Sequence, residues 1–149
     1  MISKLNNKKK EVSETIYTVF QASYKIEAKL LDAIDFPPLK RSVQNFIDSK
    51  TELFGYYSDE ILAGVIELKT ETDSTHIQSL VVHPNNFRQG IASKLMTFTL
   101  ENFNSKIITV ETGFQNIPAI NLYKQFKFIE TKKWDTSHGI RKVELKLNR

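Results

Sequence analysis

The chain contains no cysteine, which excludes disulfide bonds, thiolate metal sites and a cysteine nucleophile. It also lacks any apolar run approaching the ~18 residues that a transmembrane helix needs. The first residues, MISKLNNKKKEVSE, contain no apolar segment like that of a secretory signal. We therefore expect no membrane association, no secretory leader and a cytoplasmic location.

Two further absences narrow the function. The pattern G-x-x-x-x-G-K-[ST] does not occur, so nothing in the sequence supports nucleotide hydrolysis. The three histidines, His76, His83 and His138, are too scattered to indicate a metal site. No internal repeat or linker divides the 149 residues, and we expect a single domain over residues 1–149 that uses no metal.

Charge is unevenly distributed along the chain. Residues 1–10 hold four lysines, residues 11–75 hold 6 basic and 12 acidic side chains, and residues 76–149 hold 11 basic and 5 acidic ones. A basic C-terminal half suits a polyanionic cofactor, and an acidic N-terminal half suits a cationic amine, although ordinary surfaces also scatter charge in this way. The Lys8–Lys10 cluster is too short to indicate nucleic acid, and we expect residues 1–12 to form a frayed basic terminus.

Hydrophobic periodicity and turn residues predict alternating elements in the second half of the chain. The expected elements are helices at 14–34 and 39–47, strands at 52–57, 61–69 and 76–83, a helix at 90–102, a strand at 106–112, a helix at 116–126, and strands at 128–134 and 141–147. The order ααβββαβαββ predicts an α/β fold with a mixed sheet in which the strands joined by helical crossovers run parallel.

The most informative stretch is residues 80–96, LVVHPNNFRQGIASKLM. An apolar strand end is followed by a polar loop, and a helical pattern begins at Gly90. The free N–H groups and the positive dipole end of such a helix favour an anion such as a pyrophosphate. Gly90 would let the backbone approach phosphate oxygens without a Cβ, and Arg88 adds a fixed positive charge.

This stretch resembles the acetyl-CoA-binding motif of the GNAT superfamily of N-acyltransferases, Q/R-x-x-G-x-G/A after a β-strand. A second block, NIPAINLYKQFKF at residues 116–128, is similar to the family segment N-x-x-A-x-x-L-Y-x-x-x-G-F. The resemblance extends over roughly residues 50–147. It implies the GNAT fold, in which helices cover both faces of the mixed sheet and two parallel strands splay apart at the cofactor cleft.

Two positions depart from the family pattern. Phe87 stands where glutamine or arginine is usual, and the arginine stands one place later, at Arg88. The backbone amides are expected to hold the phosphate whether or not Arg88 contacts it. Lys127 stands where the family has glycine, so a tight turn with positive φ would be strained or differently shaped there.

The resemblance implies cofactor contacts from both blocks. Main-chain groups of the strand end would pair with the pantetheine arm like an added strand, and loop amides would hold the pyrophosphate. Asn116 is expected to cap its helix and to hydrogen-bond the cofactor arm. The residues expected to bind the cofactor are Leu80, Val81, Val82, Arg88, Gln89, Gly90, Ile91, Ala92, Ser93, Asn116 and Tyr123.

The implied reaction is direct attack of a neutral amine on the thioester carbonyl of acetyl-CoA. Tyr123 stands where the family has a tyrosine that protonates the departing thiolate, and a phenol of pKa ~10 is protonated at neutral pH. His76 is our catalytic candidate for accepting the amine proton, with Glu67, Glu111 and a water chain as alternatives. Main-chain N–H groups of the strand end at residues 80–82 would stabilise the oxyanion.

We therefore expect an N-acetyltransferase that acts in a ternary complex on an unidentified primary amine, carried by a small molecule or a protein. The alternative is a non-catalytic, acyl-CoA-binding GNAT-like module, which the departures at Phe87 and Lys127 keep open. A nucleic-acid-associated protein led by Lys8–Lys10 is a third and weaker hypothesis, and we expect no nucleic acid partner. The last strands offer edges at which a homodimer could form.

Overall fold

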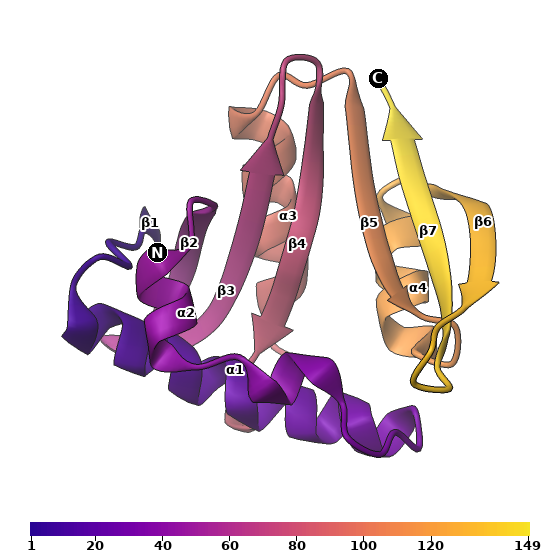
Figure 1. Ribbon diagram of the computed structural model, residues 1–149. Helices are drawn as coiled ribbons and strands as arrows, with labels where there is room; N and C mark the ends of the chain where they lie inside the picture. The colour runs from indigo at the N-terminus through magenta and orange to yellow at the C-terminus, as the bar shows by residue number, and fades with distance from the viewer.

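The computed structural model describes residues 1–149 as one seven-stranded sheet with helices on both sides (Figure 1). The elements are β1 (Ile2–Lys4), α1 (Lys10–Leu30), the 3₁₀ helix η1 (Pro37–Lys40), α2 (Val43–Asp48), β2 (Glu52–Ser58), β3 (Ile61–Thr70), β4 (Ser74–Val82), the 3₁₀ helix η2 (Pro84–Asn86), α3 (Ile91–Asn102), β5 (Ile107–Gly113), α4 (Ile117–Gln125), β6 (Ile129–Asp135) and β7 (Arg141–Asn148).

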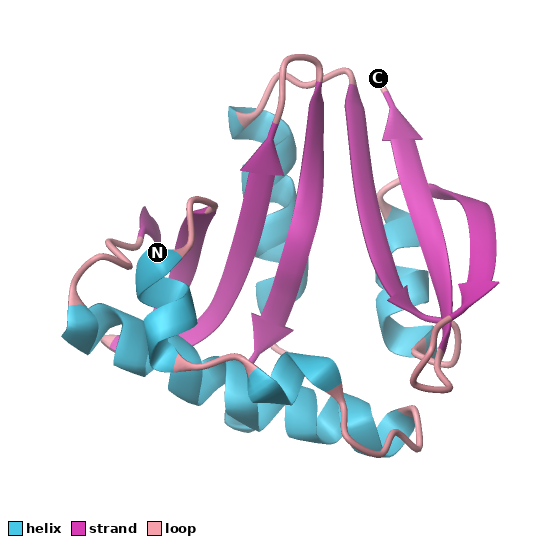
Figure 2. Cartoon of the chain, viewed as in Figure 1, coloured by secondary structure: helices cyan, strands magenta, loops and turns pink.

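The strands lie in the order β1-β2-β3-β4-β5-β7-β6, and only β4 and β5 are parallel. They are the pair joined by the α3 crossover, as the element order predicted. Figure 2 shows α1 and α2 on one side of the sheet and α3 and α4 on the other. The expected α/β fold with a mixed sheet is therefore confirmed.

The parallel pair is short, and this creates the gap on which the site depends. β4 and β5 pair only from Ser74 to Ile77 and from Ile107 to Val110. Beyond these residues the two strands separate toward α1 (Figure 1). The edge of β4 that faces the gap has no strand partner there, so its backbone groups are available to another molecule.

A β-bulge lies where β4 begins to leave β5. Glu67 of β3 pairs with Ser79, whereas Leu68 pairs with Ile77, so Gln78 is the extra residue. Before the bulge, Ile77 packs into the core under α3 and α4, and after it Val81 packs into the core under α1. The bulge therefore changes which of the β4 side chains face each layer.

The two layers have separate cores. On one side, Leu95 and Met96 of α3 pack with sheet residues such as Ile66. On the other, Phe20 of α1 packs against Phe46 of α2, with ring centroids 4.7 Å apart. Burial of these apolar faces holds the helices to the sheet, and no helix is long and apolar enough to cross a membrane.

The expectation that residues 1–12 are frayed is wrong. Ile2–Lys4 form an edge strand against β2, and α1 already begins at Lys10. Leu5 is buried, and the side-chain amide of Asn7 donates a hydrogen bond of 2.6 Å to the carbonyl of Phe46. The lysine-rich composition did not indicate this strand, because an edge strand is held by backbone hydrogen bonds and by a few buried side chains, which leave no clear pattern in the composition.

Candidate functional site

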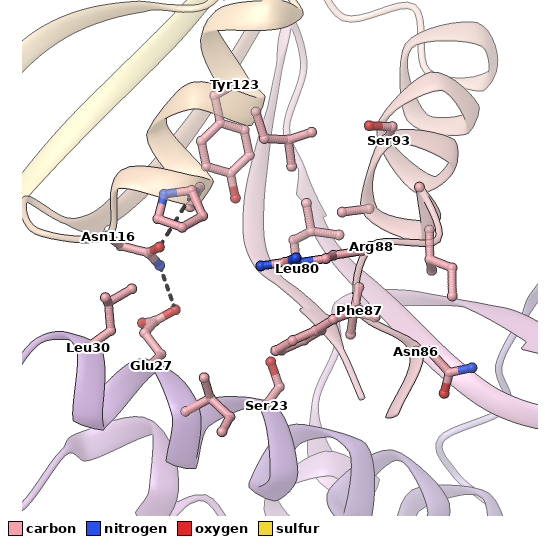
Figure 3. A pocket seen from close by; sticks show the side chains of 18 residues that line it. Ser23, Glu27, Leu30, Leu80, Asn86, Phe87, Arg88, Ser93, Asn116 and Tyr123 are labelled. Atoms are coloured by element: carbon pink, nitrogen blue, oxygen red, sulfur yellow. Dashed lines mark hydrogen bonds between the residues drawn. The ribbon is translucent and has the colours of Figure 1, made fainter. Parts of the chain in front are cut away.

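The gap between β4 and β5 contains a cavity of about 300 Å³, which we call the first cavity (Figure 3). Its walls come from α1, the end of β4, the start of α3 and α4. The lining residues are Ser23, Ile26, Glu27, Leu30, Leu80, Val82, Asn86, Phe87, Arg88, Gly90, Ile91, Ala92, Ser93, Asn116, Pro118, Ala119, Leu122 and Tyr123.

The N-terminus of α3 forms one end of the first cavity. Gly90 is its N-cap residue, with φ 72°, and no side chain caps the helix. The first-turn amides, which have no acceptor within the helix, therefore remain free beside the cavity. A Cβ at Gly90 would meet no atom within 4 Å, so there is no steric crowding at this position. Glycine is favoured there because of the positive φ.

Arg88 and Phe87 lie beside these amides. Arg88 also has positive φ, 64°, and its side chain extends into the cavity toward Leu80 (Figure 3). Arg88 forms no ion pair with the carboxylates of the chain. Phe87 lies on the α1 side of Arg88, toward Ser23, and is 43% exposed. The free cation and the free amides together form a site for an anion.

The predicted strand contacts divide between the two faces of β4. Leu80 and Val82 line the first cavity, whereas Val81 points into the core under α1. Gln89 does not line the cavity either. The remaining predicted cofactor residues do line it. The structure thus brings nine of the eleven to one cavity, and Val81 and Gln89 could contribute only through their backbone.

Asn116 connects α4 to α1. Its side-chain oxygen accepts from the Ala119 N–H at 3.3 Å, which is the expected helix cap. Its amide nitrogen donates to Glu27 at 3.0 Å and to the Thr112 hydroxyl at 3.3 Å. Asn116 therefore fixes the side chain of Glu27 at the wall of the first cavity.

Tyr123 is 5% exposed and directs its hydroxyl into the first cavity (Figure 3). Its ring packs near Phe128, with centroids 6.0 Å apart. Burial raises the pKa of Tyr123 above its ordinary value, and the neighbouring Tyr24 and Glu27 raise that pKa further. The hydroxyl is therefore protonated over the whole neutral range.

Glu27 is the residue that the sequence reading missed. It lines the first cavity and also a second cavity of about 350 Å³ on the α1 side of the sheet. Burial raises the pKa of Glu27 to about 6, against the lowering effects of Lys142 and the Asn116 hydrogen bond. One signal was available, because Glu27 is an acidic residue on the same stripe of α1 as Phe20 and Tyr24.

The second cavity lies among α1, η1, the bulge of β4, the end of β5 and the loop before β7. Its lining residues are Phe20, Tyr24, Glu27, Leu31, Phe36, Pro37, Pro38, Arg41, Gln78, Ser79, Glu111, Thr112, Gly113, His138, Ile140 and Lys142. Because Glu27 borders both cavities, a group entering from the second cavity can approach a molecule held in the first.

The structure does not bring His76 together with Tyr123. His76 lies where β4 still pairs with β5, and its Nδ1 lies 2.7 Å from the Thr109 hydroxyl. It lines neither cavity. Burial lowers the pKa of His76, although the charges of Glu111 and Glu144 act in the opposite direction.

Glu67 is also removed from the reacting position. It is fully buried, and both carboxylate oxygens accept hydrogen bonds of 2.7 Å from Arg41. The hydroxyls of Thr51 and Ser79 donate to it as well, at 2.6 and 3.0 Å. Burial alone would raise the pKa of Glu67, but these bonds and the charge of Arg41 lower it. Of the three candidates, Glu111 alone lines the second cavity.

Lys127 keeps the turn that glycine would make. Its φ is 74°, and the Phe128 N–H donates back to the Tyr123 carbonyl at 3.1 Å. This closes α4 with the hydrogen bond of a Schellman motif. Lys127 therefore adopts the strained positive φ that was expected. The turn keeps the shape that a glycine would give it.

A family model described as an acetyltransferase (GNAT) domain matches residues 27–149. The chain is 30% identical over 141 residues to UPF0157 protein YqkA of Bacillus subtilis, covering 94% of the chain and 41% of that protein. It is 29% identical over 117 residues to the N-alpha-acetyltransferase daf-31 of Caenorhabditis elegans, covering 74% of the chain and 60% of that protein. The chain thus spans about half the length of these curated relatives.

The fold also matches solved structures. The PaiA N-acetyltransferase of Thermoplasma acidophilum, solved in complex with coenzyme A, has a TM-score of 0.75 and 19% identity, with 99% of this chain and 98% of that chain covered. The ribosomal-protein-S18-alanine N-acetyltransferase of Escherichia coli has a TM-score of 0.76 and 20% identity, with 99% and 92% covered. At these identities the likeness concerns the fold.

Proposed function

The chain belongs to the GNAT acetyltransferase family, and we propose that it transfers an acetyl group from acetyl-CoA to a primary amine by direct attack in a ternary complex. One observation carries the proposal. The free edge of β4 and the uncapped N-terminus of α3 meet at the first cavity, into which Tyr123 directs its hydroxyl.

Three parts of acetyl-CoA, the pyrophosphate, the pantetheine arm and the thioester, have candidate partners at the first cavity. The pyrophosphate would lie at the α3 amides with Arg88 as a counter-charge. The pantetheine arm would run along the free edge of β4 beside Leu80 and Val82, where it can accept and donate backbone hydrogen bonds. The thioester would then lie between Tyr123 and Glu27, next to the second cavity.

The proposed reaction moves one proton from the amine to the leaving sulfur. The amine nitrogen attacks the thioester carbon, the C–N bond forms and the C–S bond breaks. Glu27 accepts the amine proton, because a carboxyl group with pKa about 6 is ionised at pH 7 to 8 and is more basic than an ordinary glutamate. Tyr123 donates its proton to the thiolate and regains one from Glu27, so every charge is balanced.

The acceptor class is also a proposal. The Caenorhabditis elegans relative is named an N-alpha-acetyltransferase. We therefore propose the α-amine of a protein N-terminus as the first acceptor to test. The second cavity, with its wall of aromatic and polar side chains, would receive the terminal residue.

Ligand binding and turnover test different parts of the proposal. Acetyl-CoA and CoA at ~100 times their dissociation constants should stabilise the protein by about 2.7 kcal/mol, whereas ATP should not. A peptide-acetylation assay should then lose about 10²-fold or more in kcat on Tyr123→Phe with CoA binding retained. CoA binding without turnover on any amine would favour the non-catalytic module, and no CoA binding would refute both functions.

A further inference from the structure

Part of one sheet face carries no helix. Figure 1 shows α3 and α4 behind the strands and α1 across the ends where β4 and β5 diverge. The opposite ends of β3, β4, β5 and β7 are therefore uncovered on the α1 side, and we call this surface the open face. It begins at the rim of the second cavity, where Gln78, Glu111 and Lys142 lie.

Strand alternation determines which side chains lie on the open face. Ile108, Val110 and Leu145 are buried in the core under α3 and α4. Their neighbours in sequence, including Thr109 and Lys146, therefore point to the other face. The same alternation places Lys69 and His76 there, because Leu68 and Ile77 belong to the buried core.

Four of these side chains form one row across the sheet. Lys69 pairs with His76, His76 with Thr109, and Thr109 with Lys146 in the strand register. Neighbouring strands lie ~4.8 Å apart, so Lys69 and Lys146 are separated by about 14 Å with His76 between them. The row therefore presents one ammonium group at each end, with an imidazole and a hydroxyl between them.

The carboxylates of the open face already have partners. Glu111 lies 3.9 Å from Lys142, and Glu144 lies 3.8 Å from Lys132. Glu144 also accepts a hydrogen bond of 2.7 Å from the Thr131 hydroxyl. Lys69 and Lys146 form no ion pair within the chain. The row thus has uncompensated positive charge beside the second cavity.

We propose that the open face docks an acidic segment of the acceptor protein, a few residues after the amine that is acetylated; this rests on the proposed transfer to a protein amine. His76 lies two residues from Gln78, or ~7 Å along the strand. Glu27 and Gln78 both line the second cavity, so an extended chain whose amine reaches Glu27 would cross this cavity and reach the row within a few residues, at ~3.4 Å per residue. Carboxylates there would meet Lys69 and Lys146.

A matched peptide series tests this inference. The peptides share one N-terminal residue and carry glutamate or glutamine at positions 3–5. We expect kcat/KM to be about tenfold higher for the glutamate peptide at low salt and the difference to shrink as salt rises. The double variant Lys69→Glu, Lys146→Glu should abolish this ratio. The control Lys10→Glu makes one such charge reversal on an exposed residue at the far end of α1 and should leave the ratio intact.

Direct binding separates this inference from the proposed activity. Fluorescence anisotropy of the labelled glutamate peptide, with CoA present, should show weaker binding to the double variant than to wild type or Lys10→Glu. Equal kcat/KM for the two peptides, or a ratio unchanged by the double variant, would overturn the docking site while acetyl transfer stands. Should no peptide be acetylated, the protein α-amine fails as the acceptor while acetyl transfer to other amines stands, and the anisotropy result alone decides the docking. Binding of a labelled oligouridylate in place of the peptide would also overturn it.

Discussion

Replacing Arg41 with methionine should destabilise the fold strongly. Glu67 is fully buried, and the Arg41 guanidinium, itself 24% exposed in its side chain, supplies its only counter-charge through two hydrogen bonds of 2.7 Å. Arg41 also stacks over the Phe46 ring at 4.0 Å, which an apolar side chain can partly replace. The variant therefore leaves a carboxylate without its cation in the interior while retaining most of the packing.

The expected loss follows from that unpaired charge. Removing one partner of a buried ion pair costs about 3–5 kcal/mol, which for a chain of this size lowers the unfolding midpoint by roughly 6–20 °C. Thermal and urea unfolding followed by circular dichroism measure both quantities. Lys40→Met is a matched control, because Lys40 pairs with Asp35 at 2.8 Å on the same segment and both side chains are largely exposed. It should change stability by less than about 1 kcal/mol.

The pH dependence makes the test specific. In the wild type the pKa of Glu67 is lowered, so its ionised form stabilises the fold above the unfolded pKa, and this contribution is lost as pH falls. Without Arg41, burial raises the pKa of Glu67, so the deficit of the variant should be largest at neutral pH and shrink toward pH 5. Equal losses for Arg41→Met and Lys40→Met, or a deficit that does not depend on pH, would refute the reasoning.

Three further predictions concern the site and its turn. Glu27→Gln should lower kcat/KM by about 10²-fold or more and remove the limb in which the rate rises with pH near 6, while the unfolding midpoint stays the same or rises, because burying an ionised Glu27 costs stability. Asn116→Ala should cost about 1 kcal/mol of stability through the lost cap. It should also move that limb to higher pH, because the Asn116 hydrogen bond lowers the pKa of Glu27 in the wild type and its removal raises that pKa. A limb that stays in place would show that Asn116 does not act on Glu27. Lys127→Gly should stabilise the protein by about 0.5–1 kcal/mol in urea unfolding, because glycine adopts φ 74° without the Cβ penalty, and a loss of stability would contradict this account of the turn.

Local patterns explain what the sequence predicted well. Gly90 has the positive φ that begins α3, and Asn116 caps α4, because both features depend on residues within three or four positions. The strands other than β1 were found for a similar reason, since period-two alternation along β7 and the apolar runs of β3 and β4 are local signals. The resemblance to the GNAT family, together with these local patterns, predicted that a cofactor site lies at the starts of α3 and α4.

The features that the sequence did not reveal depend on distant contacts. Glu27 becomes a site residue only because Asn116, 89 positions away, lies beside it in the fold. Glu67 was considered as a base, and its pairing with Arg41, 26 positions away, was not visible. His76 was placed on a suitable strand, but at the end where β4 and β5 still pair, because strand register and the point of divergence are tertiary properties.

The bulge at Gln78 explains why the two cavities and the buried ion pair occur together. With regular alternation, Ile77 and Ser79 would face the same layer, and Leu80 would face the other. The extra residue instead directs Leu80 to the first cavity and Ser79 to the α1 side, where its hydroxyl donates to Glu67. The residue that turns β4 away from β5 thus also joins the proposed cofactor strand to the Arg41–Glu67 pair. Because Arg41 lines the second cavity, the walls of both cavities are fixed to the same point of the sheet.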